Sequence, residues 1–151
     1  MPLDLGGFNS IRWMASTQTW RCDGVDIEFD RAIFDLENIK TGWVLLAQGE
    51  APEAVWDSDK SGPRPDGEGD WRRGFEVQVV APKVFGDEEP RAFMTNATGA
   101  CLGVRSLFAE FEAQCEENAG KVPLVKFTGS ESKGRTAIPK LAVEKWVDRP
   151  D

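Results

Sequence analysis

Two stretches in the first half of the chain have the apolar spacing of β-strands. Residues 25–29 (VDIEF) alternate apolar with acidic side chains, which is the period of a strand with one buried face. The alternation changes phase at residues 30–31, as it would at a β-bulge. Residues 38–42 (NIKTG) are typical of a turn, and the almost wholly apolar residues 43–47 (WVLLA) predict a central strand covered on both faces. We therefore expect the first two strands to form a hairpin.

A polar segment separates this hairpin from a third strand. Residues 49–70 are rich in Pro, Gly, Ser, Asp and Glu, and such a composition buries little apolar surface, so we expect a mobile loop there. Residues 75–79 (FEVQV) resume the alternation and predict the third strand, with Arg72 and Arg73 at its start. The acidic residues 86–90 should end it.

The second half of the chain predicts one helix followed by two strands. Between residues 96 and 120 the apolar side chains recur at steps of three and four, at Cys101, Val104, Phe108, Phe111 and Cys115. This spacing is that of an amphipathic helix. Residues 122–127 and 138–147 predict the fourth and fifth strands, and the polar residues 129–135 predict the turn between them.

The order of these elements predicts the fold class. Three strands, a helix and two more strands form the order of an OB fold, a mainly β protein built on a five-stranded Greek-key barrel with its helix between strands 3 and 4. We expect a single domain over residues 1–151, since this length suits one hydrophobic core. In that fold, strands 2 and 3 and the loops joining strands 1 to 2 and 4 to 5 bind oligonucleotides or oligosaccharides.

The composition removes most kinds of catalytic site. The chain has no histidine, so imidazole bases, Ser-His-Asp triads and mixed zinc sites cannot form. Its three cysteines form no CxxC pair. The 26 acidic residues could in principle serve a metal-dependent nuclease or a glycosidase, but the sequence shows no clear pair of carboxylates for either. We therefore expect a protein that binds rather than catalyses, with no cofactor and no metal.

The charge is distributed unevenly along the chain. The formal net charge is −8, which argues against coating of duplex DNA by bulk electrostatics. Residues 121–149 nevertheless hold seven basic and three acidic side chains, so this region is net positive by four. One face of an acidic molecule could thus be basic.

Cations and aromatic side chains fall where an OB fold would bind a strand. Binding of single strands without sequence preference needs a basic groove for phosphates and aromatic faces on which bases stack, at roughly 1–3 kcal/mol per base. The candidate nucleic-acid-binding residues are Lys40, Trp43, Trp71, Arg72, Arg73, Phe75, Lys126, Lys133, Arg135 and Lys140.

Several of these residues also have purely structural interpretations. Trp43 lies in the most apolar segment and Phe75 shares its parity with core valines, so burial competes with base stacking at both positions. Arginines 72–73 could simply make a strand end soluble, and the basic residues of 129–135 could belong to an ordinary solvated turn. For Trp71, exposure and burial remain equally open.

The chain also resembles a known family in several short phrases. They are residues 34–43 (FDLENIKTGW), 73–75 (RGF), 123–130 (PLVKFTGS) leading to Pro139, and 146–150 (WVDRP). These phrases are similar to those of the OB-fold single-stranded-DNA-binding proteins of tailed phages. The resemblance runs from about residue 29 to the end of the chain. It implies protection of single-stranded DNA in phage replication, recombination or repair, with replication or recombination proteins as partners.

This hypothesis includes a cellular compartment and has one alternative, and it leaves two points open. No secretory signal opens the sequence and no apolar run approaches the ~20 residues of a spanning helix, so we expect a cytoplasmic protein in a bacterial host, without membrane contact. The alternative function is a protein-interaction or structural β-barrel module that holds no nucleic acid. The sequence leaves open whether the protein is a monomer or a dimer, and whether Trp13 and Trp20 cover the groove or fill the barrel.

Overall fold

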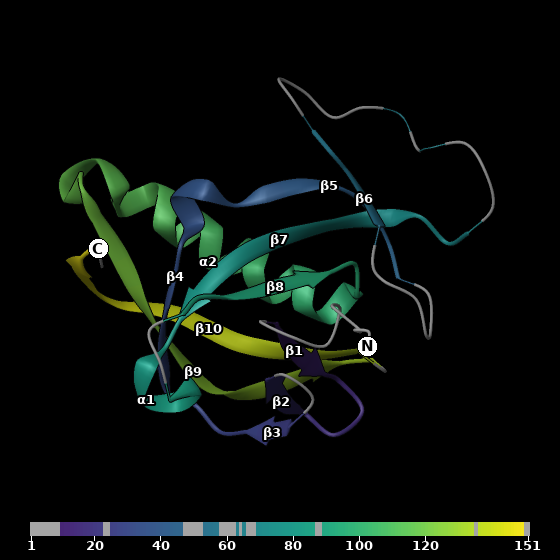
Figure 1. Ribbon diagram of the computed structural model, residues 1–151, viewed down its shortest axis with the longest axis horizontal. Coiled ribbons are helices and arrows are strands. Elements are labelled where there is room, and N and C mark those ends of the chain that lie inside the picture. The colour runs from purple at the N-terminus through teal and green to yellow at the C-terminus, as the bar shows by residue number, and fades with distance from the viewer. Residues whose placement is uncertain are drawn as a thin grey trace.

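The computed structural model is mainly β, with one main helix and antiparallel strand pairing, an arrangement compatible with a β-barrel-like fold (Figure 1). It describes residues 10–22, 25–46, 53–57, 63, 65, 69–86, 89–134 and 136–149. The described residues contain ten strands, so the expected count of five is not confirmed. The predicted mobile loop falls largely outside the described residues, as does Arg135.

A small antiparallel sheet of three strands precedes the main sheet. It consists of β1 (Ile11–Met14), β2 (Thr19–Cys22) and β3 (Val25–Ile27), in that order. The alternating residues 25–29 were expected to be the first strand of the barrel, and that is wrong. Only three of them form a strand, and it pairs with β2, because an antiparallel partner lies just upstream in the sequence.

The expected hairpin between the first two strands is also wrong. Strands β4 (Arg31–Phe34) and β5 (Lys40–Leu45) are separated by the short 3-10 helix η2 (Leu36–Asn38), yet both pair antiparallel with β7 (Arg72–Val80). The chain keeps its direction because Leu36 is buried in the core and the Asp35 N–H donates to the Gln78 carbonyl across the gap, at 2.9 Å. The turn residues thus interrupt one long strand without reversing it.

Besides β1 and β2, two described strands lie where the sequence predicted none. Strand β6 (Glu53–Trp56), inside the predicted loop, pairs with β5. Strand β8 (Arg91–Thr95) follows the short helix α1 (Pro82–Phe85) and pairs with β7. Both are four or five residues long, too short to give a clear period.

The main helix and the last two strands agree with the sequence in order and kind. Helix α2 (Thr98–Gln114) continues into the 3-10 helix η3 (Cys115–Asn118) and is followed by β9 (Lys121–Lys133) and β10 (Thr136–Asp148). The last two strands are longer than expected, since most of the predicted turn at 129–135 belongs to their hairpin. Helix α2 packs on β10 through Gly99 and Gly103, where an added Cβ would meet the backbone of Ala137 and Pro139.

An aromatic core joins the N-terminal sheet to the main sheet. Trp20 is 1% exposed and lies 5.0 to 5.7 Å, between ring centroids, from Phe29, Phe93 and Phe127. Trp13 packs on Trp20 and donates a hydrogen bond from Nε1 to the Ala137 carbonyl. Both N-terminal tryptophans therefore fill the interior.

The main sheet has the order β10-β9-β4-β7-β5-β6, and β8 pairs with the other edge of β7. Figure 1 shows the paired strands β5 and β7 (the β5–β7 ribbon) above β9 and β10 (the β9–β10 ribbon), with their loop ends on the same side of the molecule. This arrangement places the two segments that contain the predicted binding residues.

Candidate nucleic-acid interface

The β5–β7 ribbon places an aromatic ring beneath a guanidinium group. Trp43 on β5 lies directly opposite Arg73 on β7, and the Arg73 Cζ atom is 5.5 Å from the centroid of the Trp43 ring. Trp43 is half-buried, so neither the exposed nor the buried alternative describes it fully. The pair combines a stacking surface with a cation, the two features that a single-strand site needs.

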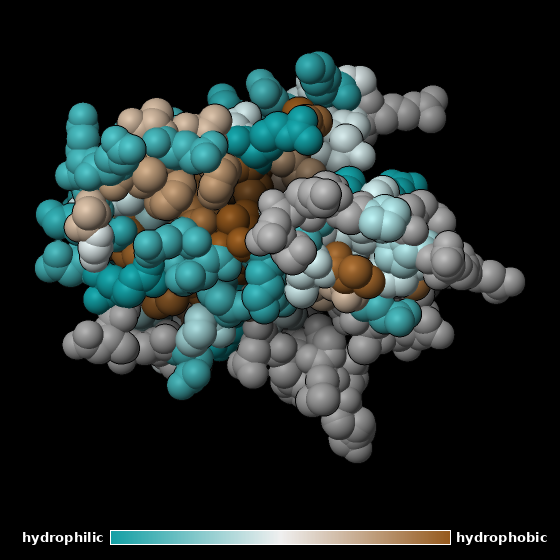
Figure 2. Space-filling model, turned by 90° about the horizontal axis from the view of Figure 1, so that it is seen from above, coloured by the Kyte–Doolittle hydropathy of each residue, from teal (hydrophilic) through white to brown (hydrophobic). Residues whose placement is uncertain are grey.

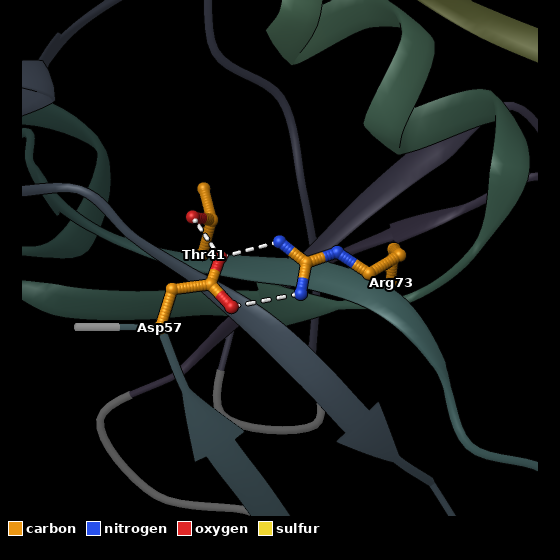
Figure 3. Close-up of polar contacts among 3 residues, drawn as sticks. All are labelled: Thr41, Asp57 and Arg73. Carbon is orange, nitrogen blue, oxygen red and sulfur yellow. Dashed lines mark hydrogen bonds and ion pairs between the residues drawn. The ribbon is translucent and has the colours of Figure 1, made fainter. Parts of the chain in front are cut away.

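Arg73 is held by a carboxylate that arrives from β6. Its Nη1 donates to Asp57 Oδ1 at 2.9 Å and its Nη2 donates to Oδ2, while the Thr41 hydroxyl also donates to Oδ2 at 2.9 Å (Figure 3). The Asp57 side chain is 15% exposed and that of Arg73 is 41% exposed. Hydrogen bonding to Asp57, reinforced by its charge, raises the pKa of Arg73. The guanidinium is thus already paired in a bidentate geometry that a phosphate could also satisfy.

The other cations of this ribbon also face carboxylates. Lys40 Nζ lies 3.7 Å from Glu76, and Arg72 Nη2 lies 2.8 Å from Asp70. The Lys40 and Arg72 side chains are more than half exposed, and exposed ion pairs contribute only about 0–1 kcal/mol each. Such carboxylates can be exchanged for phosphates at little cost.

The two aromatic candidates Phe75, on β7, and Trp71, just before β7, differ in burial. Phe75 is 4% exposed and packs edge-to-face on Phe93, with ring centroids 5.1 Å apart. Its predicted role in base stacking is therefore wrong, because the strand period turns it into the core together with Val77. Trp71, just before β7, is half-buried.

The β9–β10 ribbon carries a second group of cations. Lys126, Lys133 and Lys140 are all exposed. Lys126 lies opposite Arg31 of β4, whose side chain forms an ion pair with Glu144 of β10. The hydrogen bond from Arg31, together with the charges of Arg31, Lys126 and Lys145, lowers the pKa of Glu144.

Strand register decides which of these side chains share a face. Lys40 lies opposite Glu76 on β7. Glu76 and Val80 are on the same face of β7, and Val80 lies opposite Ile33 of β4, which is on the same face as Arg31. Because side chains alternate along a strand, Lys40, Arg31 and Lys126 belong to one face of the sheet. Trp43 and Arg73 belong to the opposite face, toward α2. The predicted residues therefore form two groups rather than one.

A groove lies between α2 and the β5–β7 ribbon. Its volume is about 370 Å³, and Figure 2 shows a hollowed apolar strip bordered by hydrophilic residues on the side of the molecule where β5 lies. Thr41, Arg73 and Phe75 line it on the ribbon side, and Cys101, Val104, Arg105, Phe108, Ala109 and Glu112 line it on the α2 side. Burial raises the pKa of the Cys101 thiol, and the nearby Arg105 charge partly offsets this effect.

Among the charged residues that sequence reasoning missed in these sites are Arg31, Asp57, Arg105 and Lys145. Of these, Arg105 had a usable signal, because it lies one helical turn from Cys101 and from Phe108 on the predicted helix. Asp57 had none, since its partner is 16 residues away and is reached only through strand pairing.

Among the described residues, no group of three or more Cys, Asp and Glu side chains lies close enough to hold a metal ion. In the same part of the chain, no helix combines the length and the apolar character needed to cross a membrane.

No protein-family model, no curated protein and no solved structure matches this chain. The functional assignment therefore rests on the geometry of the strands and on the residues that they carry.

Proposed function

We propose that this chain binds single-stranded DNA, largely without sequence preference and without catalysis, as an OB-like barrel. The observation that carries the proposal is the half-buried Trp43 ring beneath Arg73 on the β5–β7 ribbon; exposed Arg72 precedes Arg73 on β7 and shares the other face of the sheet with Lys40. Bases can stack on such a ring while guanidinium groups hold the phosphates. The biological role that fits is protection of single strands in phage replication, recombination or repair.

Strand order supports the OB-like part of the proposal. We take β4 and β5 as one interrupted strand. Both pair with β7 on one side, and β4 pairs with β9 on the other side. Strand β7 also pairs with β8. A Greek key has the order fourth, first, second, third, which is the order β9, β4–β5, β7, β8. Helix α2 connects the third of these strands to the fourth.

The cations of both ribbons can serve one bound strand. The loop ends of the two ribbons lie on the same side of the molecule (Figure 1), so a strand that crosses this side would pass the start of β7, with Arg72 and Arg73 on its two faces, and then the end of β9, with Lys133. Phosphates would displace Asp57 and Asp70 from the arginines. Each contact should add about 0.7 to the slope of log affinity against log salt.

Titration of the intrinsic tryptophan fluorescence with oligo(dT) tests the proposal. We expect quenching that weakens steeply with added salt. The Trp43→Ala variant should bind about 5- to 160-fold more weakly, from a stacking contribution of roughly 1–3 kcal/mol. Trp43→Phe should retain most of the affinity with a smaller quenching amplitude, because the ring remains and the reporter is lost.

A charge-matched pair of variants separates specific contacts from net charge. Arg72→Gln should weaken binding and reduce the salt slope, whereas Lys83→Gln, which removes an exposed cation from α1, should do neither. If the wild-type protein shows no quenching at low salt, single-strand binding is refuted, and the protein-interaction or structural module takes its place. Mg²⁺-dependent cutting of the DNA would contradict a purely binding function.

A further inference from the structure

The groove between α2 and the β5–β7 ribbon has two chemically different walls. The α2 wall is one helix face, because Cys101, Arg105, Phe108 and Glu112 follow one another at steps of four, three and four. The ribbon wall presents Thr41 and Arg73, with the buried Phe75 below them. Apolar side chains thus form the floor, and charged groups stand at the rim.

The charges on the helix wall give the groove a direction. Arg105 and Glu112 are seven residues apart, which corresponds to about 10 Å along α2. Both are exposed, and Arg105 forms no ion pair within the part of the chain that the structure describes. An anionic group is therefore favoured at the Arg105 end and disfavoured at the Glu112 end, whose carboxylate can accept a hydrogen bond from an N–H group.

The size of the groove limits what can enter. Pockets for small ligands usually measure about 300–1,000 Å³ and are mostly apolar, with a few polar groups that fix the orientation. At about 370 Å³ this groove lies near the lower end of that range, enough for one flat ring system with a sugar but too small for a helix of a partner.

We infer that this groove takes one unpaired nucleobase of the bound strand, with the adjacent phosphate at Arg105. The inference rests on the proposed function and adds a specific subsite to it. The base would lie against the half-buried Phe108, over the buried floor formed by Val104 and Phe75, with its polar edge toward Glu112, as unstacked bases are held elsewhere between aromatic and apolar side chains. Arg73, on the opposite wall, connects this subsite to the stacking surface of Trp43.

Two alanines on α2 allow a matched test. Ala109 and Ala113 are both exposed and lie one turn apart on α2. Ala109 is one of the described residues that line the groove, and Ala113 is not. Ala109→Trp should fill the groove and weaken oligo(dT) binding, measured by fluorescence anisotropy of labelled DNA, at least 5-fold. Ala113→Trp should change the affinity less than 2-fold. Urea unfolding of each variant shows whether the fold is kept, and Arg105→Gln, which adds no bulk, should weaken binding and lower the salt slope by about 0.7.

Cys101 supplies a second readout inside the groove. In a Cys115→Ser background, Cys101 is the half-buried thiol that remains, while Cys22 is buried. Alkylation of Cys101 by iodoacetamide at mildly alkaline pH, followed by mass spectrometry, should slow at least 3-fold when oligo(dT) is bound. Bound DNA should give no such protection in the Ala109→Trp variant.

The outcomes distinguish the subsite from the function as a whole. Wild-type protein that fails to bind oligo(dT) overturns both proposals. If the wild type binds, but Ala109→Trp and Arg105→Gln bind equally well or Cys101 is not protected, the subsite is refuted and single-strand binding stands. An Ala109→Trp variant that changes the mass in sedimentation velocity, with unaltered DNA affinity, would assign the groove to a second copy of the chain and also refute the subsite.

Discussion

Substitution of Gly99 by alanine should loosen the contact between α2 and β10. An added Cβ at Gly99 would overlap the carbonyl oxygen of Ala137 and lie 3.0 Å from its carbonyl carbon and 3.2 Å from Thr136 Cγ2. The obstacle is largely strand backbone, which cannot rotate away, so the helix must retreat. Overpacking of this kind costs about 1–3 kcal/mol. Alanine recovers at most about 1 kcal/mol through helix propensity, and less near the first turn.

We therefore expect Gly99→Ala to lower the free energy of unfolding by about 1–2 kcal/mol, which corresponds to roughly 2–8 °C in Tm for a chain of this size. Urea unfolding followed by tryptophan fluorescence measures the change. Gly103→Ala, whose Cβ would lie 2.7 Å from the Pro139 carbonyl oxygen and 3.0 Å from its Cγ, should cost less. Ser106→Ala, on an exposed position of the same helix, is the control and should be neutral or slightly stabilising. A Gly99→Ala variant as stable as the wild type would refute the close packing of α2 on β10.

Two further predictions concern ion pairs. Asp57→Asn should free Arg73 and tighten oligo(dT) binding at low salt by up to about 5-fold, in keeping with the ~0–1 kcal/mol of a partly exposed pair. Glu53→Gln, on the strand β6 that precedes Asp57, is the control and should have little effect. Weaker binding by Asp57→Asn would contradict a competition between carboxylate and phosphate. The pair of Glu144 with Arg31 lowers the pKa of Glu144, so its stabilising effect is present above the pKa of an unfolded glutamate and is lost as the pH falls through the lower folded pKa. Urea midpoints of wild type and Glu144→Gln should accordingly differ at neutral pH and converge in acid, and a difference that persists below the folded pKa would show that the pair is not its cause.

Features with a local pattern were predicted well. Helix α2 follows from the spacing of Cys101, Val104, Phe108 and Phe111, and the alternation at 75–79 lies within β7. The burial of Phe75 was already implied by its parity with Val77. It competed in the sequence with base stacking on the expected OB-fold binding face, and the structure agrees with burial. Strands β6 and β8 were missed because they are too short to show a period.

The candidate site was predicted only in part. Trp43 and Arg73 lie on neighbouring strands, as expected for a binding surface built from strands two and three. The Arg73 guanidinium lies over the Trp43 ring, a contact that the sequence did not predict. The division of the cations into two groups on opposite sheet faces could not be foreseen, since one residue of shift in register exchanges the faces. Asp57 and Arg105 enter the site only because β6 adds to β5 and because α2 lies across the ribbon.

Residue order along this chain is enough to establish a mainly β protein with one amphipathic helix, a basic final segment and no histidine chemistry, because periodicity, charge and composition are local properties. Folding establishes the rest. Whether residues 36–38 reverse the chain or merely interrupt a strand depends on the burial of Leu36 and on hydrogen bonds to β7, some forty residues away. Which carboxylate neutralises which arginine depends on strand register in the same way. Such contacts form between segments that are distant in the chain, and their free energy comes from the packed whole rather than from any one segment.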